Sequence, residues 1–425
     1  MLSTLKNAWK IPDLRRKLLF TLLMLAVFRL GSNIPVPFMD KEVIQSLFQG
    51  GGGGVLELFN LMSGGAFGRM TIFALNIYPY ITASIVIQLL TIVIPQLEAL
   101  AKEGEEGRKK IAQYTRYLTV VFALIQAIGI SVGLFRQAVI GQGFLPISVV
   151  VITITAGTAF LMWLGEQITE NGIGNGISLI IFTGIISRIP GGIYNALNLW
   201  LKAKTVSIIE LILFVVIAII VIAGVVAIQE GQRRIPVQYA KKVVGRKMYG
   251  GQSTHIPLKV LMAGVIPVIF STSLLAFPQT LAFFFSEDFA AGVTKWLSPQ
   301  GNPGVWIYSL LNVVLIIFFT YFYTAIQFNP VEYANNLKQN GGFIPGIRPG
   351  RPTSEYLNRV ISRITLLGAV VLALIATLPT ILTSFGNLNI GFGGTALLIV
   401  VGVALETVKQ IESQMMMRHY KGFLK

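Results

Sequence analysis

Two acidic residues near the end of an apolar run, Glu166 and Glu170, are the side chains best placed to do chemistry in this 425-residue chain. Carboxylates inside a membrane segment can relay protons, but this pair falls at the boundary of its predicted span, which favours a solvated or helix-capping role. The sequence has no Cys and only two His, His255 and His419, both outside the apolar runs. We therefore expect no catalytic residue, no metal site and no cofactor.

The apolar runs are the elements that must position any functional residue. With 54% hydrophobic and 12% charged residues, the composition is typical of an integral membrane protein. A helix needs about 20 apolar residues to cross a bilayer, and the runs predict ten transmembrane helices in one all-α membrane domain. The predicted spans are 18–36, 72–94, 115–135, 146–164, 176–190, 207–229, 259–279, 304–328, 361–382 and 392–408.

The positive charges alternate between the two sides of these spans. Most of the 34 Lys and Arg lie in the N-terminal segment, the second, sixth and eighth loops and the C-terminal tail. By the positive-inside rule, both termini are predicted to be cytoplasmic. Much of the net charge of +16 then reflects topology and attraction to anionic lipid. Within the spans, Arg29 is the one clear ionisable residue, and it is close enough to the outer end to reach the membrane surface. Because a coupled carrier would be expected to hold mid-span acids, this pattern favours a conduit.

Two loops on the predicted cytoplasmic side carry sequence patterns beyond the positive charge that the topology requires. Residues 230–258 alternate basic with β-branched or aromatic residues and predict a protruding strand-like hairpin. Residues 329–360 begin with a short helical stretch and continue through GGFIPGIRPGRP, where Gly and Pro predict a shaped turn that presents Arg348 and Arg351. These loops could bind a protein partner, and a basic surface of the kind that attracts nucleic acid is conceivable.

Several breaks interrupt the apolar pattern. The glycine run 50–54 reads as a flexible tether, and the apolar segment 55–68 after it is too short to cross a bilayer. That segment is either an interfacial amphipathic helix or a re-entrant segment, and a re-entrant segment requires a cavity lined by protein or water. Pro79 and the Gly264–Pro267 pair predict kinks in the second and seventh spans.

Six long motifs, in order along the whole chain, resemble those of the SecY family, whose members are central subunits of bacterial protein-conducting channels. They are EEGRKKIAQYTRY (105–117), FLMWLGEQITENGIGNGIS (160–178), EGQRRIPVQYAKK (230–242), QSTHIPLKV with MAGVIPVIF (252–270), FNPVEYANNLKQNGGFIPGIRPG (328–350) and FGGTALLIVV (392–401). The glycine run 50–54 is unusual for this family and leaves the length of the tether open.

The resemblance implies two pseudo-symmetric five-helix halves, residues 1–187 and 206–425, joined by a hinge loop at 188–205. It makes 55–68 a re-entrant plug that closes the outer funnel, in place of an interfacial helix. The plug residues it implies are Val55, Leu58, Phe59, Met62, Gly64, Gly65 and Phe67.

Three further sets of residues follow from the same resemblance. The pore ring comprises Ile77, Ile81, Ile181, Ile269 and Ile399, of which Ile77 and Ile81 are four apart and share one helix face. Polar candidates near a lateral gate, formed by the second and third spans against the seventh and eighth, are Thr82, Ser84, Gln126, Ser271 and Thr272. Residues implied in partner binding are Arg246, Lys247, Arg348 and Arg351.

The implied partners are the membrane subunits SecE and SecG, the SecA motor ATPase, the ribosome, signal sequences, unfolded polypeptides and membrane lipid, with no nucleic-acid substrate. The resemblance places the chain in the bacterial inner membrane as a non-enzymatic channel that passes secretory polypeptides and releases membrane segments into lipid. Two other classes remain open on the pattern alone. One is a small-solute secondary transporter with inverted repeats, and the other is an insertase or scaffold without a continuous pore.

Overall fold

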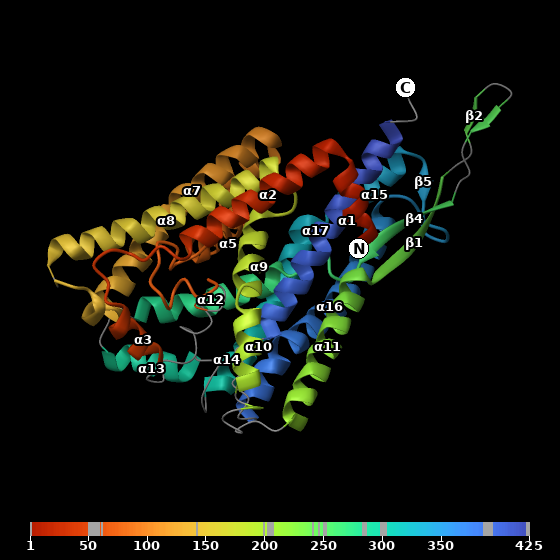
Figure 1. The fold of residues 1–425 in the computed structure, drawn as a ribbon. Coiled ribbons are helices and arrows are strands. Elements are labelled where there is room, and N and C mark those ends of the chain that lie inside the picture. The colour runs from red at the N-terminus through yellow and green to blue at the C-terminus, as the bar shows by residue number, and fades with distance from the viewer. Residues whose placement is uncertain are drawn as a thin grey trace.

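The computed structural model describes residues 2–49, 60, 63–141, 143–198, 200–201, 208–239, 242–244, 247–249, 253–282, 287–297, 304–385 and 394–421. Helices dominate the described chain (Figure 1). The α-helices of the first part are α1 (Leu2–Lys10), α2 (Pro12–Gly31), α3 (Lys41–Gln49), α5 (Tyr78–Val93), α6 (Pro95–Lys102), α7 (Glu105–Ile128), α8 (Phe144–Asn171), α9 (Gly176–Ile186) and α10 (Ile189–Asn198). Those of the second part are α11 (Ile208–Glu230), α12 (Ile266–Ala282), α13 (Glu287–Leu297), α14 (Gly304–Gln327), α15 (Pro330–Gln339), α16 (Arg351–Phe385) and α17 (Gly394–Lys421). A π-helical turn, η1 (Gly129–Leu134), and a 3-10 turn, η2 (Arg136–Ala138), extend α7.

The helices confirm a multi-pass membrane architecture. Within the described ranges, five helices are long and apolar enough to cross a bilayer, and a sixth span results if α5 and α6, which meet at a 100° bend, are counted together. Two shorter apolar helices, Val215–Glu230 and Ile266–Gln279, lie on two more of the predicted spans. Each of the ten predicted spans overlaps a helix. Large apolar side chains such as Leu22 and Leu367 stay exposed on the outside, as expected where lipid covers the protein.

Two predicted kinks are wrong, because both prolines lie where a helix starts. The second span begins at Tyr78 instead of residue 72, so Pro79 occupies the first turn of α5, where a missing N–H costs no helix hydrogen bond. The seventh span begins at Ile266, so Pro267 again lies at the start and Gly264, at φ +60°, belongs to the preceding turn. The proline inside α12 is Pro278.

The hairpin predicted for residues 230–258 is confirmed. Strand β1 (Gln232–Tyr239) pairs antiparallel with β4 (Ser253–Lys259), with Ile235 opposite Ile256, and β5 (Gly342–Phe343) pairs with the other edge of β1. Two short strands, β2 (Lys242–Val244) and β3 (Lys247–Tyr249), pair with each other beyond that sheet. Ile235 and Val237 point inward and are buried in a small apolar cluster with residues of α15 and α16. Figure 1 shows the strands extending from one end of the helices, while α3 and α13 lie near the opposite end.

The short helix predicted at the start of loop 329–360 is also confirmed, as α15. The side chain of Asn329 accepts hydrogen bonds from the backbone N–H groups of Val331 and Glu332, and Pro330 fills the first helical position. The span after it starts earlier than predicted. Helix α16 begins at Arg351 and runs unbroken to Phe385, so Arg351 starts a long helix instead of lying in a loop.

The largest buried apolar cluster lies where several spans meet. It joins side chains from α2, α5, α7, α8, α9, α12, α14 and α17 with those of the turns at residues 66–77. A second cluster packs α11, α12, α14, α16 and α17 together. The segments that supply the first cluster are separated by hundreds of residues in the chain, so its composition is set by tertiary packing.

Candidate functional site

The five isoleucines predicted to form the pore ring lie together in the largest buried cluster. They come from the start of α5, from α9, from α12 and from α17. Their exposed fractions are at most 5%: Ile77 1%, Ile81 5%, Ile181 1%, Ile269 5% and Ile399 1%. The structure therefore places side chains from four separate segments in one apolar cluster, as a hydrophobic constriction requires.

Ile77 was predicted to share a helix face with Ile81, but it lies just before the helix. Ile77 precedes α5 and has φ −99° and ψ 4°, which are not helical values. Its carbonyl nevertheless accepts the hydrogen bond from the Ile81 N–H at 3.0 Å, the spacing of the first helical turn. The two side chains thus stay on one face, and both join the cluster.

Within the predicted plug, Asn60 has a helical backbone, and residues 63–68 form a turn without helix or strand. Of the predicted plug residues, Gly64, Gly65 and Phe67 are described, whereas Val55, Leu58, Phe59 and Met62 lie outside the described residues. The Phe67 N–H donates to Ser63 Oγ at 3.1 Å. The Phe67 ring is 1% exposed and meets the ring of Phe135 edge to face, with centroids 5.7 Å apart. Phe67 and the five isoleucines thus belong to the same buried cluster.

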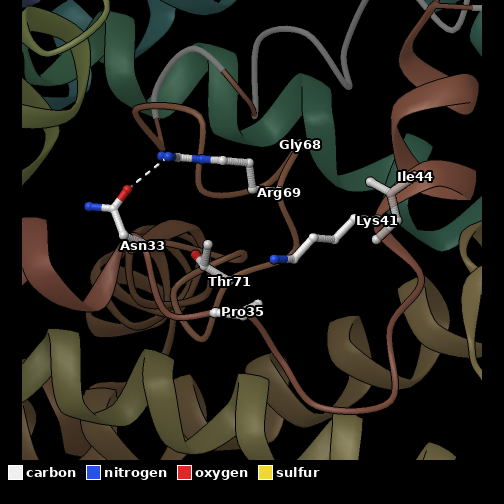
Figure 2. A pocket seen from close by; sticks show the side chains of 7 residues that line it. All are labelled: Asn33, Pro35, Lys41, Ile44, Gly68, Arg69 and Thr71. Carbon is white, nitrogen blue, oxygen red and sulfur yellow. Dashed lines mark hydrogen bonds between the residues drawn. The ribbon is translucent and has the colours of Figure 1, made fainter.

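Backbone hydrogen bonds hold the far end of this turn. The Val36 N–H donates to the Met70 carbonyl at 2.9 Å, and the Ile72 N–H donates to the Ile34 carbonyl at 3.0 Å. The segment after α2 and the segment after the predicted plug are thus paired side by side. A pocket of about 140 Å³ opens beside them, lined by Asn33, Pro35, Lys41, Ile44, Gly68, Arg69 and Thr71 (Figure 2).

The lateral-gate candidates are placed on helices that pack against one another. Helix α12 contacts α5, and Phe122 of α7 meets Phe277 of α12 at a ring separation of 6.0 Å. Thr82 and Thr272 donate to carbonyls of their own helices, Tyr78 and Val268, each at 3.0 Å, which is the packing use of hydroxyls in membrane helices.

The other three gate candidates differ from these threonines. Ser271 donates instead to Asn312 Oδ1 of α14 at 2.6 Å, and so links α12 to α14. Ser84 is half-buried and accepts from Gln88 at 3.4 Å. Gln126 Oε1 is buried without a hydrogen-bond partner in the described chain. Four of the five candidates are therefore buried. Besides Gln126 Oε1, the atoms Gln88 Oε1 of α5, Ser273 Oγ of α12 and Ser309 Oγ of α14 are buried without a hydrogen-bond partner among the described residues.

In the loop 329–360, Arg348 and Arg351 are exposed, as the predicted turn required. The Arg348 carbonyl accepts from Thr353 Oγ1 at 2.9 Å, and Arg351 Nε donates to Glu355 Oε1 at 3.0 Å. Arg246 lies outside the described residues, and Lys247 starts β3.

Sequence reasoning missed an ion pair at the boundary of the third and fourth spans. Glu166 Oε1 accepts from Arg116 Nε at 2.8 Å, and the Glu166 side chain is only 21% exposed. The prediction of a solvated or capping role is therefore wrong for Glu166, whereas Glu170 is exposed. No local signal could have revealed the pair, because 50 residues separate its members.

Arg29 was expected to extend to the membrane surface, but its guanidinium lies beside Gly64 of the predicted plug. Its Nη1 atom is buried without a hydrogen-bond partner among the described residues, and it lies 2.9 Å from the position that a Cβ on Gly64 would take. Arg69, which no sequence motif singled out, also contacts the predicted plug turn, because its Nε donates to the Gly65 carbonyl.

Two solved structures with a similar fold are described as channels. One, described as "The structure of a protein conducting channel", matches with a TM-score of 0.65 and 21% identity, over 94% of this chain and 92% of that chain. Another, "Sec61 in the Canine ribosome-channel complex from the endoplasmic reticulum", matches with a TM-score of 0.63 and 19% identity, also over 94% and 92%. The fold is that of the Sec-type membrane channels.

Sequence comparison identifies the family. A family profile described as SecY matches residues 71–408. The protein called "Protein translocase subunit SecY" of Halalkalibacterium halodurans is 50% identical, and that of Streptomyces coelicolor is 48% identical, each over the full length of both chains. The chain belongs to the SecY family, and it is a multi-pass membrane subunit of a protein-conducting channel.

Proposed function

We propose that Ile77, Ile81, Ile181, Ile269 and Ile399 form the constriction through which an unfolded polypeptide passes. The observation that carries this proposal is that five isoleucines from four separate segments lie in one buried cluster, together with Phe67 of the plug. Branched apolar side chains that close on one point exclude water and ions, and they can part around an extended chain without binding any of its side chains strongly. Residues 55–68 seal the outer side while no substrate is present.

The same proposal assigns roles to the two halves of the chain, to the hinge and to the lateral gate. Residues 1–187 and 206–425 are two halves that move about the segment 188–205, and the seam of α5 and α7 against α12 and α14 is the lateral gate for signal sequences and membrane segments. The contact between α5 and α12 supports this seam. The Ser271–Asn312 hydrogen bond keeps α12 and α14 together on one side of it.

We place the chain in a bacterial inner membrane with both termini in the cytoplasm, assembled with SecE- and SecG-type subunits. The exposed Arg348 and Arg351, with Arg246 and Lys247, form the docking surface for a SecA-type motor and for the ribosome. These partners and the membrane potential supply the energy, and the chain itself acts without a cofactor.

The lack of cysteines allows a direct test. Single cysteines replace Ile81, Ile181 or Ile399 in the full chain, which is reconstituted with its SecE partner and SecA, and a precursor carrying one cysteine is stalled in transit. Leu367→Cys is the matched control, because Leu367 is 61% exposed on the outer face of α16. We expect disulfides to the precursor at the three ring positions and none at 367.

Two results would overturn the proposal. If the precursor crosses the membrane but reacts at none of the three positions, the pore lies elsewhere. If no precursor crosses while a small solute is transported, the chain acts as a carrier.

A further inference from the structure

The guanidinium of Arg69 contacts two separate segments near the outer end of α2. Its Nη1 donates to Asn33 Oδ1 at 2.8 Å (Figure 2). Its Nε donates to the Gly65 carbonyl at 3.1 Å, and its Nη2 reaches the Gly64 carbonyl at 3.5 Å, the longest and weakest of the three contacts. One side chain thus joins the plug turn to the segment that follows α2.

Asn33 is held in the orientation that this contact needs. Its Nδ2 donates to the Arg29 carbonyl at 2.8 Å, one turn earlier in the chain. Because the amide nitrogen is engaged there, the amide oxygen is left to face Arg69. Asn33 therefore presents a fixed acceptor at the end of α2.

The turn that Arg69 holds lies directly on the end of α9. A Cβ added to Gly64 would lie 2.9 Å from the Gly184 carbonyl oxygen and 2.9 Å from Ser187 Oγ. Gly64 and Gly65 have φ +66° and +86°, left-handed values that favour glycine and that turn both carbonyls toward one side chain. Since α9 also carries Ile181, the position of this turn is coupled to a helix of the ring.

We propose that Arg69 is a positioning residue that clamps the plug in its closed place through Asn33; this rests on the proposed role of 55–68 as the plug. The Arg69 clamp consists of the Arg69 side chain, Asn33 Oδ1 and the carbonyls of Gly64 and Gly65. A planar guanidinium can serve acceptors in two directions at once, whereas a lysine ammonium offers one compact group of donors. Arg69 is exposed and borders the 140 Å³ pocket, so water can replace its bonds when the plug moves away.

The test measures ion leak through the full chain reconstituted in liposomes with its SecE partner, without a precursor. Arg69→Gln and Arg69→Lys each lose part of the clamp, and we expect the leak to rise about five- to tenfold, the effect of losing one or two hydrogen bonds. Asn33→Asp gives up the Nδ2 bond to the Arg29 carbonyl but places a carboxylate opposite the guanidinium, and this charge-assisted bond is stronger than the neutral one that is lost, so the leak should fall and the opening caused by a precursor should be delayed. A merely structural loss of packing would not produce these opposite directions.

Lys41→Gln is the matched control. Lys41 lines the same pocket, and its substitution removes the same charge, but the described chain offers it no hydrogen-bond partner. Its leak should stay at the wild-type level. The double variant Arg69→Gln with Asn33→Ala should leak no more than Arg69→Gln alone, because both substitutions remove the same interaction, the Arg69–Asn33 hydrogen bond.

Deletion of 55–68, measured in parallel, separates failure of the clamp from failure of the plug. If the deletion leaks and Arg69→Gln does not, the clamp is refuted and the plug stands. If Lys41→Gln leaks as much as Arg69→Gln, charge alone is responsible and the clamp is again refuted. If the deletion does not leak, the proposed sealing role of 55–68 fails, and the clamp fails with it.

Discussion

Replacing Phe67 by alanine should open the channel in the absence of substrate. The Phe67 ring is 1% exposed, packs in the cluster that contains the five isoleucines and meets Phe135 edge to face at 5.7 Å. Removing a buried phenylalanine costs about 3–5 kcal/mol, of which about 1 kcal/mol belongs to the aromatic pair. If the plug leaves this cluster when it opens, the cost falls on the closed state alone. A loss of about 3 kcal/mol raises the ratio of open to closed channels roughly 100-fold.

Single-channel conductance across a planar bilayer measures this ratio directly. Phe289→Ala is the control, because Phe289 is 52% exposed on α13 and its loss should leave the conductance unchanged. A cycle with Phe135→Ala should give a coupling of about 1 kcal/mol between the two rings. The reasoning is refuted if Phe67→Ala lowers the unfolding temperature, as loss of core packing must, but leaves the closed channel as tight as before.

Three further substitutions test other parts of the site. Gly64→Ala combines a left-handed φ of +66° with three contacts at 2.9 Å, to Arg29 Nη1, the Gly184 carbonyl and Ser187 Oγ. It should lower the unfolding temperature more than Gly341→Ala, which has φ +70° but no neighbour within 4 Å; equal losses in thermal melts would show that this crowding is unimportant. Ile181→Ser places a hydroxyl in the buried cluster and should raise ion leak through the closed channel; an unchanged leak in liposomes would contradict a dewetted constriction at this residue. Arg116→Gln breaks a partly exposed ion pair and should reduce the free energy of unfolding by about 1 kcal/mol while precursor transport continues; a transport defect larger than the stability loss would assign the pair a role in gating.

Local patterns in the sequence predicted most of the elements. Apolar runs located the ten helical segments because lipid contact requires a continuous stretch of apolar side chains. Alternation along 230–258 predicted the β1–β4 hairpin, and the start of loop 329–360 predicted the short helix α15. The helix boundaries were less predictable. Pro79 and Pro267 were interpreted as kinks within helices, whereas each lies in the first turn of a helix. The sequence could not separate these cases, because proline occurs both at kinks and in first turns.

The sequence by itself determined which segments enter the membrane, and its long motifs determined the family. Only the tertiary structure decided which side chains meet. Any isoleucine in a span reads as lipid-facing or packed, and packing alone brought Ile77, Ile81, Ile181, Ile269 and Ile399 into one cluster. The Arg116–Glu166 pair and the Arg69 clamp likewise join residues that are 50 and 36 positions apart. Hydropathy and spacing report on neighbours within one helix, so contacts between distant segments become visible only when the chain is folded.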